Sequence, residues 1–248
     1  VGKAGETSVA SLDLDSVEYP ALLKPTLLDG GFGIVKVGEP SDLAYKWNDE
    51  RIVKGYQYIL QSYLPGTVAC LAIYGQDGKI VAYTLWKTLI TSRRRLYYSA
   101  RAMEYFDDQN LIDLSKRLIS AMRWSGIANI DFLINPDDGT VNILDFNPRF
   151  GQSLLGSLVA GVNFPFLACL GAMGMEYPNM QQQEAIRYAH PATQSKMLIS
   201  RLIGRREPVK IQWRHGSLQF AVRDPLPELV DTFHRILKQF RRSNHAKR

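Results

Sequence analysis

Short runs of apolar, β-branched and aromatic residues recur along this chain between polar turn segments, and each such run predicts a β-strand. Turn residues separate consecutive stretches, and the Gly-Gln-Asp-Gly and Pro-Asp-Asp-Gly segments are typical of hairpin connections. The strands predicted in this way span residues 19–26, 34–37, 68–74, 80–87, 126–134 and 141–149.

Apolar residues spaced three and four apart predict helices between these strands, so the element order is mixed α/β. Beyond Pro178 we also expect short strands around residues 209–213 and 217–222. One predicted helix begins at a Ser41 cap, and a second begins at Asp107 or Asp108 and closes near Gly126. Further helices are predicted at residues 154–158, 164–173 and 225–240.

The hairpin of residues 126–149 gathers polar side chains on one face. If its turn centres near Asp138, Asp131 lies roughly opposite Asp145, and Asp145, Asn147 and Arg149 share its face because side chains alternate along a strand. Oxygen ligands of this kind suit Mg²⁺, with a nucleoside triphosphate as the natural co-ligand. A structural ion pair is the alternative interpretation. The opposite face is expected to point into a core through Ile130, Phe132, Ile134, Leu144 and Phe146.

A glycine cluster follows the first predicted strand. Without Cβ atoms, the backbone N–H groups of Gly30, Gly31 and Gly33 can approach phosphate oxygens, and Lys24 can add a positive charge nearby. Glycines between strands also serve simply as a hairpin turn, so this segment alone leaves both interpretations open.

Four blocks, in this order, resemble the ATP-grasp superfamily, and particularly its carboxylate-amine ligase and carbamoyl-phosphate-synthase-like members. The resemblance spans roughly residues 7–175. The blocks are the Lys24-Pro25 strand with its glycine loop, Gln61-Ser62-Tyr63-Leu64-Pro65-Gly66, Gly126–Phe132 and Leu144–Phe150.

The resemblance implies an α/β (α+β) chain with the ATP-grasp fold, in which two α/β lobes hold ATP between two sheets. We expect a small lobe with the glycine flap at residues 1–63, a lobe with the metal site at 64–178 and a C-terminal α/β appendage at 179–248. Relatives usually carry a further α/β domain upstream, which implies either a fragment or a chain without that domain.

The resemblance also implies the role of each nucleotide-contacting residue. Lys24 would contact the nucleotide, and Gly30, Gly31 and Gly33 would form a flap over the phosphates. The hinge between the two lobes would offer mainly backbone groups to adenine. Its residues are Gln61, Ser62, Tyr63 and Leu64.

The remaining implied residues concern the metal and the chemistry. Asp131, Asp145 and Asn147 would hold Mg²⁺, with Mn²⁺ as an alternative metal. Arg149 would stabilise charge on the transferring phosphoryl group or on an acyl phosphate. Lys87 sits where many relatives place a basic residue aimed at the terminal phosphates, although a solvated lysine at a strand end fits the sequence equally well.

Three features of the sequence depart from the family pattern. The hinge begins with Gln61-Ser62 in place of an acidic residue, or of Gln followed by Glu. Thr67-Val68 stands where many relatives carry a ribose-binding Glu, so ribose recognition has no assigned residue. Asp replaces the commoner Glu at both Asp131 and Asp145, which shortens each metal ligand but keeps its oxygen chemistry.

The resemblance implies an enzyme, an ATP-dependent ligase that activates a substrate carboxylate as an acyl phosphate for attack by an amine or other nucleophile. One alternative is phosphorylation of bicarbonate or carbamate, as in carbamoyl phosphate synthesis. Another is a nucleotide-binding module that turns nothing over. The partners would be small molecules, and oligomer formation is left open.

Composition agrees with a cytoplasmic enzyme. The chain of 248 residues is 46% hydrophobic but has no apolar run long enough to span a membrane. Its two cysteines lie in apolar stretches, which predicts buried thiols. The net charge of +6 raises the question of nucleic acid, but the cations cluster at Arg93–Arg95, Arg205-Arg206 and the tail, and no aromatic stacking platform accompanies them. The Arg93–Arg95 run could instead attract ATP or an anionic substrate.

Overall fold

A computed structural model describes most of the chain and divides it into two compact units. Unit 1 comprises Val1–Val68, Ile90–Ala100 and Leu133–Asn142; unit 2 comprises Ala69–Leu89, Arg101–Phe132 and Ile143–Arg248. The described residues are 2–3, 17–28, 31–91, 100–183, 185–204, 209–212, 215, 218–226 and 230. Gly30, Arg93–Arg95 and nearly all of the helix predicted at 225–240 lie outside these ranges.

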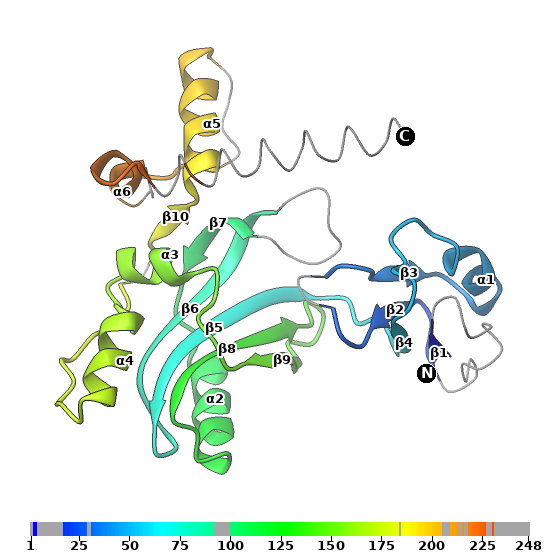
Figure 1. Ribbon diagram of the computed structural model, residues 1–248, viewed down its shortest axis with the longest axis horizontal. Helices are drawn as coiled ribbons and strands as arrows, with labels where there is room; N and C mark the ends of the chain where they lie inside the picture. Colours follow the sequence, from blue (N-terminus) through cyan, green and yellow to red (C-terminus); the bar gives the residue numbers. More distant parts are fainter. Residues whose placement is uncertain are drawn as a thin grey trace. The chain divides into compact units, whose positions relative to one another are not determined.

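Unit 1 contains a four-stranded sheet with the order β1-β4-β2-β3 (Figure 1). Its strands are β1 (Gly2–Lys3), β2 (Ala21–Pro25), β3 (Val35–Val37) and β4 (Gln57–Ser62), and each neighbouring pair is antiparallel. One face forms a core of Leu23, Val35, Val37, Leu43 and Tyr58. The strands predicted at residues 19–26 and 34–37 are therefore confirmed as β2 and β3.

The helix expected after a Ser41 cap is shorter than predicted. Ser41 lies inside a 3₁₀-helix, Pro40–Asp42, which leads into α1 (Leu43–Lys46). The hydroxyl of Ser41 donates to the carboxylate of Glu39 and caps nothing. The helix ends early because Asn48 and Asp49 follow, and both residue types favour turns over helix interiors.

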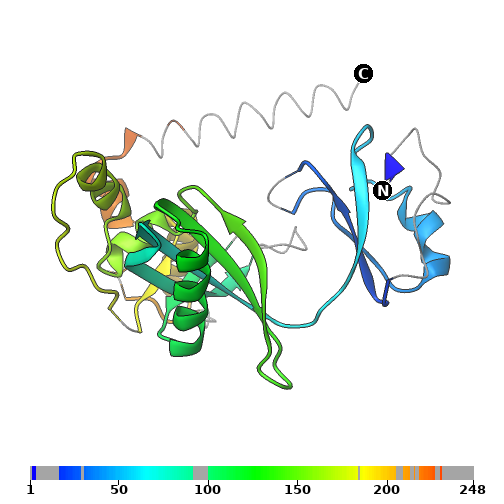
Figure 2. The same cartoon turned by 90° about the horizontal axis from the view of Figure 1, so that it is seen from below.

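Unit 2 is built on a six-stranded sheet with the order β10-β7-β6-β5-β8-β9 (Figures 1 and 2). The strands are β5 (Thr67–Gln76), β6 (Lys79–Thr91), β7 (Ala100–Tyr105), β8 (Gly126–Ile134), β9 (Val141–Asn147) and β10 (Arg187–Ala189). Strand β10 pairs with β7 although it belongs to the segment expected as a C-terminal appendage. A separate appendage, like the other predicted domain limits, stays a prediction.

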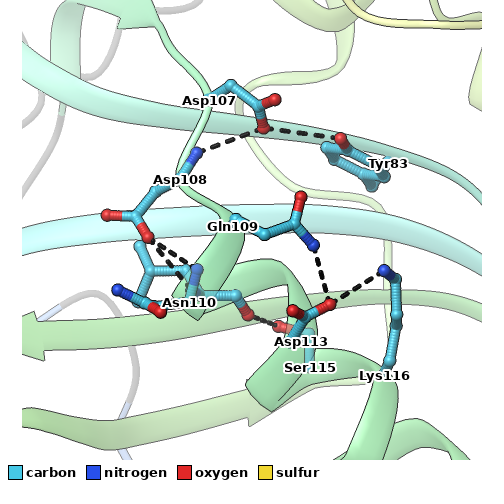
Figure 3. A network of polar contacts seen from close by, with 9 residues as sticks. Tyr83, Asp107, Asp108, Gln109, Asn110, Asp113, Ser115 and Lys116 are labelled. Atoms are coloured by element: carbon cyan, nitrogen blue, oxygen red, sulfur yellow. Dashed lines mark hydrogen bonds and ion pairs between the residues drawn. The ribbon is translucent and has the colours of Figure 1, made fainter.

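Helix α2 (Gln109–Ala121) has Asp108 as its N-cap, which is one of the two residues, Asp107 or Asp108, that the sequence predicted. The Asp108 carboxylate accepts hydrogen bonds from the backbone N–H groups of Asn110 and Leu111 at 3.0 and 3.2 Å, which compensates two donors that no helical carbonyl reaches (Figure 3). The neighbouring Asp107 accepts a bond from the Tyr83 hydroxyl of β6. The helix ends at a Met122 cap, so Gly126 does not close it and instead begins β8.

Helices α3 (Leu154–Val159) and α4 (Phe164–Ala172) belong to unit 2 and pack against its sheet. The Thr84 hydroxyl on β6 contacts the Ser157 hydroxyl on α3 at 2.8 Å, and both residues are fully buried. The apolar core beside them combines Ala72, Tyr74 and Ala82 of the sheet with Val162, Phe164 and Leu167. Helix α3 and the core residues from α4 therefore cover the sheet face that carries Thr84.

Two sequence predictions are wrong near the end of the described chain. The stretch expected as a strand around residues 217–222 forms helix α6 (Leu218–Arg223), which follows α5 (Pro191–Leu202), and residues 209–212 form no strand. Apolar alternation over six residues fits a helical period nearly as well as a strand period, so only partners elsewhere in the chain decide. No helix among the described residues is long and apolar enough to cross a membrane.

Candidate active site

In unit 1, Lys24 and Gln61 lie on the sheet face opposite the core. Leu22 of β2 pairs with Gln61 of β4, and Leu23 pairs with Leu60, so Lys24 and Gln61 project to the same side. The Lys24 Nζ donates a hydrogen bond to the Gln61 Oε1 at 3.0 Å. Because an ammonium group only donates, it orients the Gln61 amide with its oxygen toward Lys24 and its nitrogen elsewhere.

The hinge residues that follow are anchored by the chain just before β2. The Tyr63 N–H donates to the Pro20 carbonyl at 2.8 Å, and the Ser62 hydroxyl accepts from the Glu18 N–H at 3.1 Å. The hinge backbone is thus partly occupied by internal bonds, while Leu64 remains 48% exposed. Lys36, which sequence reasoning did not single out, places its Nζ 3.8 Å from the centre of the Tyr63 ring.

The described part of the glycine loop requires glycine for backbone reasons. Gly31 and Gly33 have φ angles of 72° and 74°, in the left-handed region that disfavours side chains. A Cβ atom at Gly33 would also lie 2.9 Å from the Tyr58 hydroxyl and 3.2 Å from Pro25. These facts explain the local turn, and the flap role of the loop stays a prediction.

In unit 2, the Asp131 carboxyl on β8 is partly buried beside the thiol of Cys70. Burial raises the pKa of Asp131, and the negative charge of Asp145 adds to this rise. A hydrogen bond with Cys70 and the positive charge of Arg149 act in the opposite direction. Asp145 and Arg149 are thus close enough to act on the pKa of Asp131, and the predicted position of Asp131 opposite Asp145 stays a prediction.

Hydrogen bonds connect the polar residues of β9 with one another. The Asn147 Nδ2 donates to the Asp145 Oδ2 at 3.0 Å, and the Asp145 Oδ1 accepts from the Phe146 N–H at 2.9 Å. The Arg149 guanidinium donates to the Asn147 Oδ1 at 3.4 Å, which is a long contact. Asp145 and Arg149 are exposed, so this end of the strand is open to small ligands.

One expectation for this hairpin is wrong. Leu144 was expected to point into a core, but it is 40% exposed, whereas Ile130 and Phe132 on β8 are fully buried as predicted. Among the described strands, β9 stands at the edge of the six-stranded sheet, with β8 as its neighbour. Its apolar side chains are therefore only partly covered.

The donor set of β8 and β9 fits a hard cation. Among the described residues, no group of three or more His, Cys, Asp and Glu side chains is arranged to hold a metal ion. Asp131, Asp145 and Asn147 offer two carboxylates and one amide oxygen, and Mg²⁺ commonly binds through one or two carboxylates and takes its other ligands from water and phosphates. The partly buried Asp131 carboxyl, with Asp145 nearby, is also a place where a cation would relieve repulsion.

Lys87 lies apart from these residues. Its Nζ forms an ion pair with Glu104 at 3.1 Å, and Arg187 binds the same carboxylate at 2.7 Å. Trp86 pairs with Cys70 across β5 and β6, so the next residue, Lys87, projects from the opposite sheet face to the Cys70 thiol that contacts Asp131. Lys87 is therefore an ion-paired residue inside β6, which differs from the solvated lysine at a strand end that was the alternative interpretation.

The cysteines are both free, and only one matches its expectation. Cys70 is buried, whereas Cys169 on α4 is exposed. The buried residues of α4 are Phe164, Leu167 and Leu170, which recur every three residues, and Cys169 falls outside that stripe.

Sequence reasoning missed Asn129, two residues before Asp131. It is 8% exposed, and its Nδ2 donates to the carbonyl of Arg149 at 2.5 Å. Asparagine is depleted from strand interiors, so an Asn inside the apolar run of residues 127–134 was the available signal.

The mixed α/β architecture is compatible with the ATP-grasp fold, and the comparisons with known proteins identify it as that fold. A family model described as "ATP-grasp in the biosynthetic pathway with Ter operon" matches residues 56–194, more than half of the chain. The chain therefore belongs to the ATP-grasp ligase family.

Its relatives include much longer proteins. The arginine-specific large chain of carbamoyl phosphate synthase from Bacillus subtilis is 25% identical over 162 residues, which are 62% of this chain and 15% of that protein. A carboxyaminoimidazole ribonucleotide synthase from Aspergillus clavatus, solved with ATP, has a TM-score of 0.58 at 13% identity and covers 76% of this chain and 52% of its own.

A further solved structure with a similar fold is the biotin carboxylase domain of Hydrogenobacter thermophilus 2-oxoglutarate carboxylase. It was solved with MgADP and bicarbonate and has a TM-score of 0.56 at 15% identity, covering 75% of this chain and 44% of its own. The chain thus spans only part of each relative, about half at most.

Proposed function

We propose that this chain is the ATP-binding part of an ATP- and Mg²⁺-dependent ligase that activates a substrate carboxylate as an acyl phosphate. An amine or another nucleophile would then displace phosphate. The observation that carries the proposal is the set of polar side chains on β8 and β9, where Asp131, Asp145 and Asn147 lie beside the exposed guanidinium of Arg149.

Each unit would contribute its own contacts. In unit 1, Lys24 and Gln61 would bind the nucleotide together with the hinge residues Ser62, Tyr63 and Leu64, and Gly30, Gly31 and Gly33 would cover the phosphates. In unit 2, Asp131, Asp145 and Asn147 would hold Mg²⁺, with Mn²⁺ as a substitute. When bound, the metal would neutralise charge on the phosphate oxygens.

Arg149 would provide the main charge stabilisation from the protein. Its guanidinium has only long hydrogen bonds within the chain, at 3.4 Å, so its donors remain available for an anionic ligand. Catalysis of phosphoryl transfer depends chiefly on position and charge, and requires no side-chain nucleophile. We leave Lys87 out of the proposed phosphate contacts because its ammonium group is paired with Glu104 and projects from the opposite face of the sheet to Cys70.

A second candidate function is the phosphorylation of bicarbonate or carbamate. The similarity to carbamoyl phosphate synthase large chains favours it. The two candidates share ATP binding and differ in the phosphoryl acceptor. ADP release that requires an added amine and carboxylate would support the ligase, and release with bicarbonate alone would support the second candidate.

The test of the shared site compares Asp145→Asn with Arg149→Ala. Asp145→Asn removes a full charge from the metal ligands, so Mg²⁺-dependent ATP affinity and turnover should both fall. Arg149→Ala should lower turnover by about 10²-fold or more with little change in ATP affinity. The contact between the guanidinium and the phosphoryl group would strengthen as negative charge develops on that group in the transition state. The measurements are the melting temperature with Mg-ATP and single-turnover phosphate release.

Matched controls are Asp137→Asn in the exposed hairpin turn and Arg117→Ala on the exposed side of α2. Neither should change the response to Mg-ATP. If wild-type protein shows no rise in melting temperature at millimolar Mg-ATP, the assignment of a nucleotide site is wrong. If Asp145→Asn and Arg149→Ala lose stability equally and keep a normal magnesium response, the polar residues form a structural ion pair.

A further inference from the structure

Asn129 is a buried polar residue that the proposed reaction does not use directly. It lies on β8 two residues before Asp131, so both side chains project from the same face of the strand. Only 8% of Asn129 is exposed. A buried amide is costly unless its hydrogen bonds are made, so the partner of Asn129 shows what it holds in place.

That partner is the main chain at Arg149. The Asn129 Nδ2 donates to the Arg149 carbonyl at 2.5 Å, across 20 residues of sequence. The amide also lies against Gly151, where a Cβ atom would approach the Asn129 Cγ to 2.8 Å. Asn129 therefore contacts the segment 149–151 in two places, once by a hydrogen bond and once by close packing.

The side chain of Arg149 is held much more loosely than its backbone. Its NH1 and NH2 groups contact the Phe150 carbonyl and the Asn147 Oδ1, each at 3.4 Å. Such long contacts orient a side chain weakly. The position from which the guanidinium projects is consequently determined by the main chain, and thus by Asn129.

We propose that Asn129 is a positioning residue, which holds the main chain of residues 149–151 so that the Arg149 guanidinium is presented on the face that carries Asp131. This inference rests on the proposed role of Arg149. It assigns to Asn129 an effect on the rate of phosphoryl transfer that acts entirely through Arg149.

The test begins with Asn129→Asp, which keeps the shape of the side chain but replaces the N–H donor with an oxygen facing a carbonyl. Turnover should fall by about 10-fold or more, while ATP affinity should change less than about 3-fold. A misplaced Arg149 guanidinium matters most when charge develops on the transferring phosphoryl group. The control is Asn110→Asp on the exposed surface of α2, which introduces the same charge away from the segment.

A double variant separates positioning from general stability. If Asn129 acts through Arg149, Asn129→Asp should cause no further loss of turnover in an Arg149→Ala background. Independent, multiplicative losses would overturn the proposal. Should Asn129→Asp fail to fold, Gly151→Ala displaces the same contact from the other side and should show the same dependence on Arg149.

Hydrogen exchange provides a readout without turnover. Backbone amides of residues 149–153 should exchange faster in Asn129→Asp than in wild type, with Asn110→Asp unchanged. If wild-type protein turns over no ATP, the proposed function fails. The hydrogen-exchange rates then test by themselves whether Asn129 holds the main chain of residues 149–151. Faster exchange would support its hold on the segment, and unchanged exchange would overturn it.

Discussion

The buried hydroxyl pair of Thr84 and Ser157 fastens α3 to the six-stranded sheet, and its removal should have a measurable cost. Both residues are fully buried, and their oxygens lie 2.8 Å apart across 73 residues of sequence. The nearby Tyr105 hydroxyl donates to the Ser153 carbonyl at 3.3 Å, just before α3. Helix α3 follows the segment that carries Arg149, so this pair lies close in sequence to the candidate site.

The expected magnitude follows from the partner that each substitution leaves behind. Thr84→Val keeps the side-chain shape and leaves the buried Ser157 hydroxyl without this partner, so we expect a loss of about 1–2 kcal/mol. Ser157→Ala leaves the buried Thr84 hydroxyl without this partner, so we expect a similar loss of about 1–2 kcal/mol. In the double variant Thr84 no longer needs a partner, and the loss should fall short of the sum by about 1 kcal/mol.

Urea unfolding and thermal melts measure these losses. For a chain of this size, 1–2 kcal/mol corresponds to a fall in Tm of about 2–8 °C. Ser120→Ala on the exposed surface of α2 is the control and should stay within about 0.5 kcal/mol of wild type. Strictly additive losses, or a Thr84→Val variant as stable as wild type, would refute the claim that this hydrogen bond holds α3 to the sheet.

Two further predictions concern other parts of the molecule. In urea unfolding, Gly33→Ala should destabilise the protein by about 1 kcal/mol or more beyond the loss caused by Gly55→Ala. Both glycines have a positive φ, but a Cβ atom would be crowded at Gly33 and free of neighbours at Gly55. Equal losses would argue against the close contact between residue 33 and Tyr58. Burial alone would raise the pKa of Glu104, yet hydrogen bonds from Arg187 and Lys87 hold it below its usual value of 4.5. Its ion pairs therefore stabilise the fold above about pH 4.5 and lose that effect as pH falls, so Glu104→Gln should cost about 1 kcal/mol at pH 7 and little near pH 3; a cost independent of pH would contradict this.

Features that depend on local order were predictable from the sequence. Apolar, β-branched and aromatic runs between turn motifs identified the strands that became β5, β6, β8 and β9, because both signals lie within a few consecutive residues. The Asp108 cap of α2 was equally local, since its carboxylate bonds N–H groups two and three residues away. The family blocks were recognisable for the same reason, as each is a short continuous motif.

Features that depend on distant partners were decided only by the tertiary structure. The edge position of β9 exposed Leu144, and the ion pair with Glu104 gave Lys87 a partner that strand periodicity could not supply. The six-residue alternation at 217–222 became helix α6 because so short a pattern does not separate the two periods.

Asn129 shows the same division within the candidate site. The sequence determined that Asp131 and Asp145 occupy neighbouring strands of a hairpin, because a turn of known type joins those strands. It did not determine which group would meet the carbonyl of Arg149, since that contact requires the chain beyond β9 to return against β8. Hydrogen bonds across such separations depend on how the elements pack, and packing is a property of the whole unit and of no single segment.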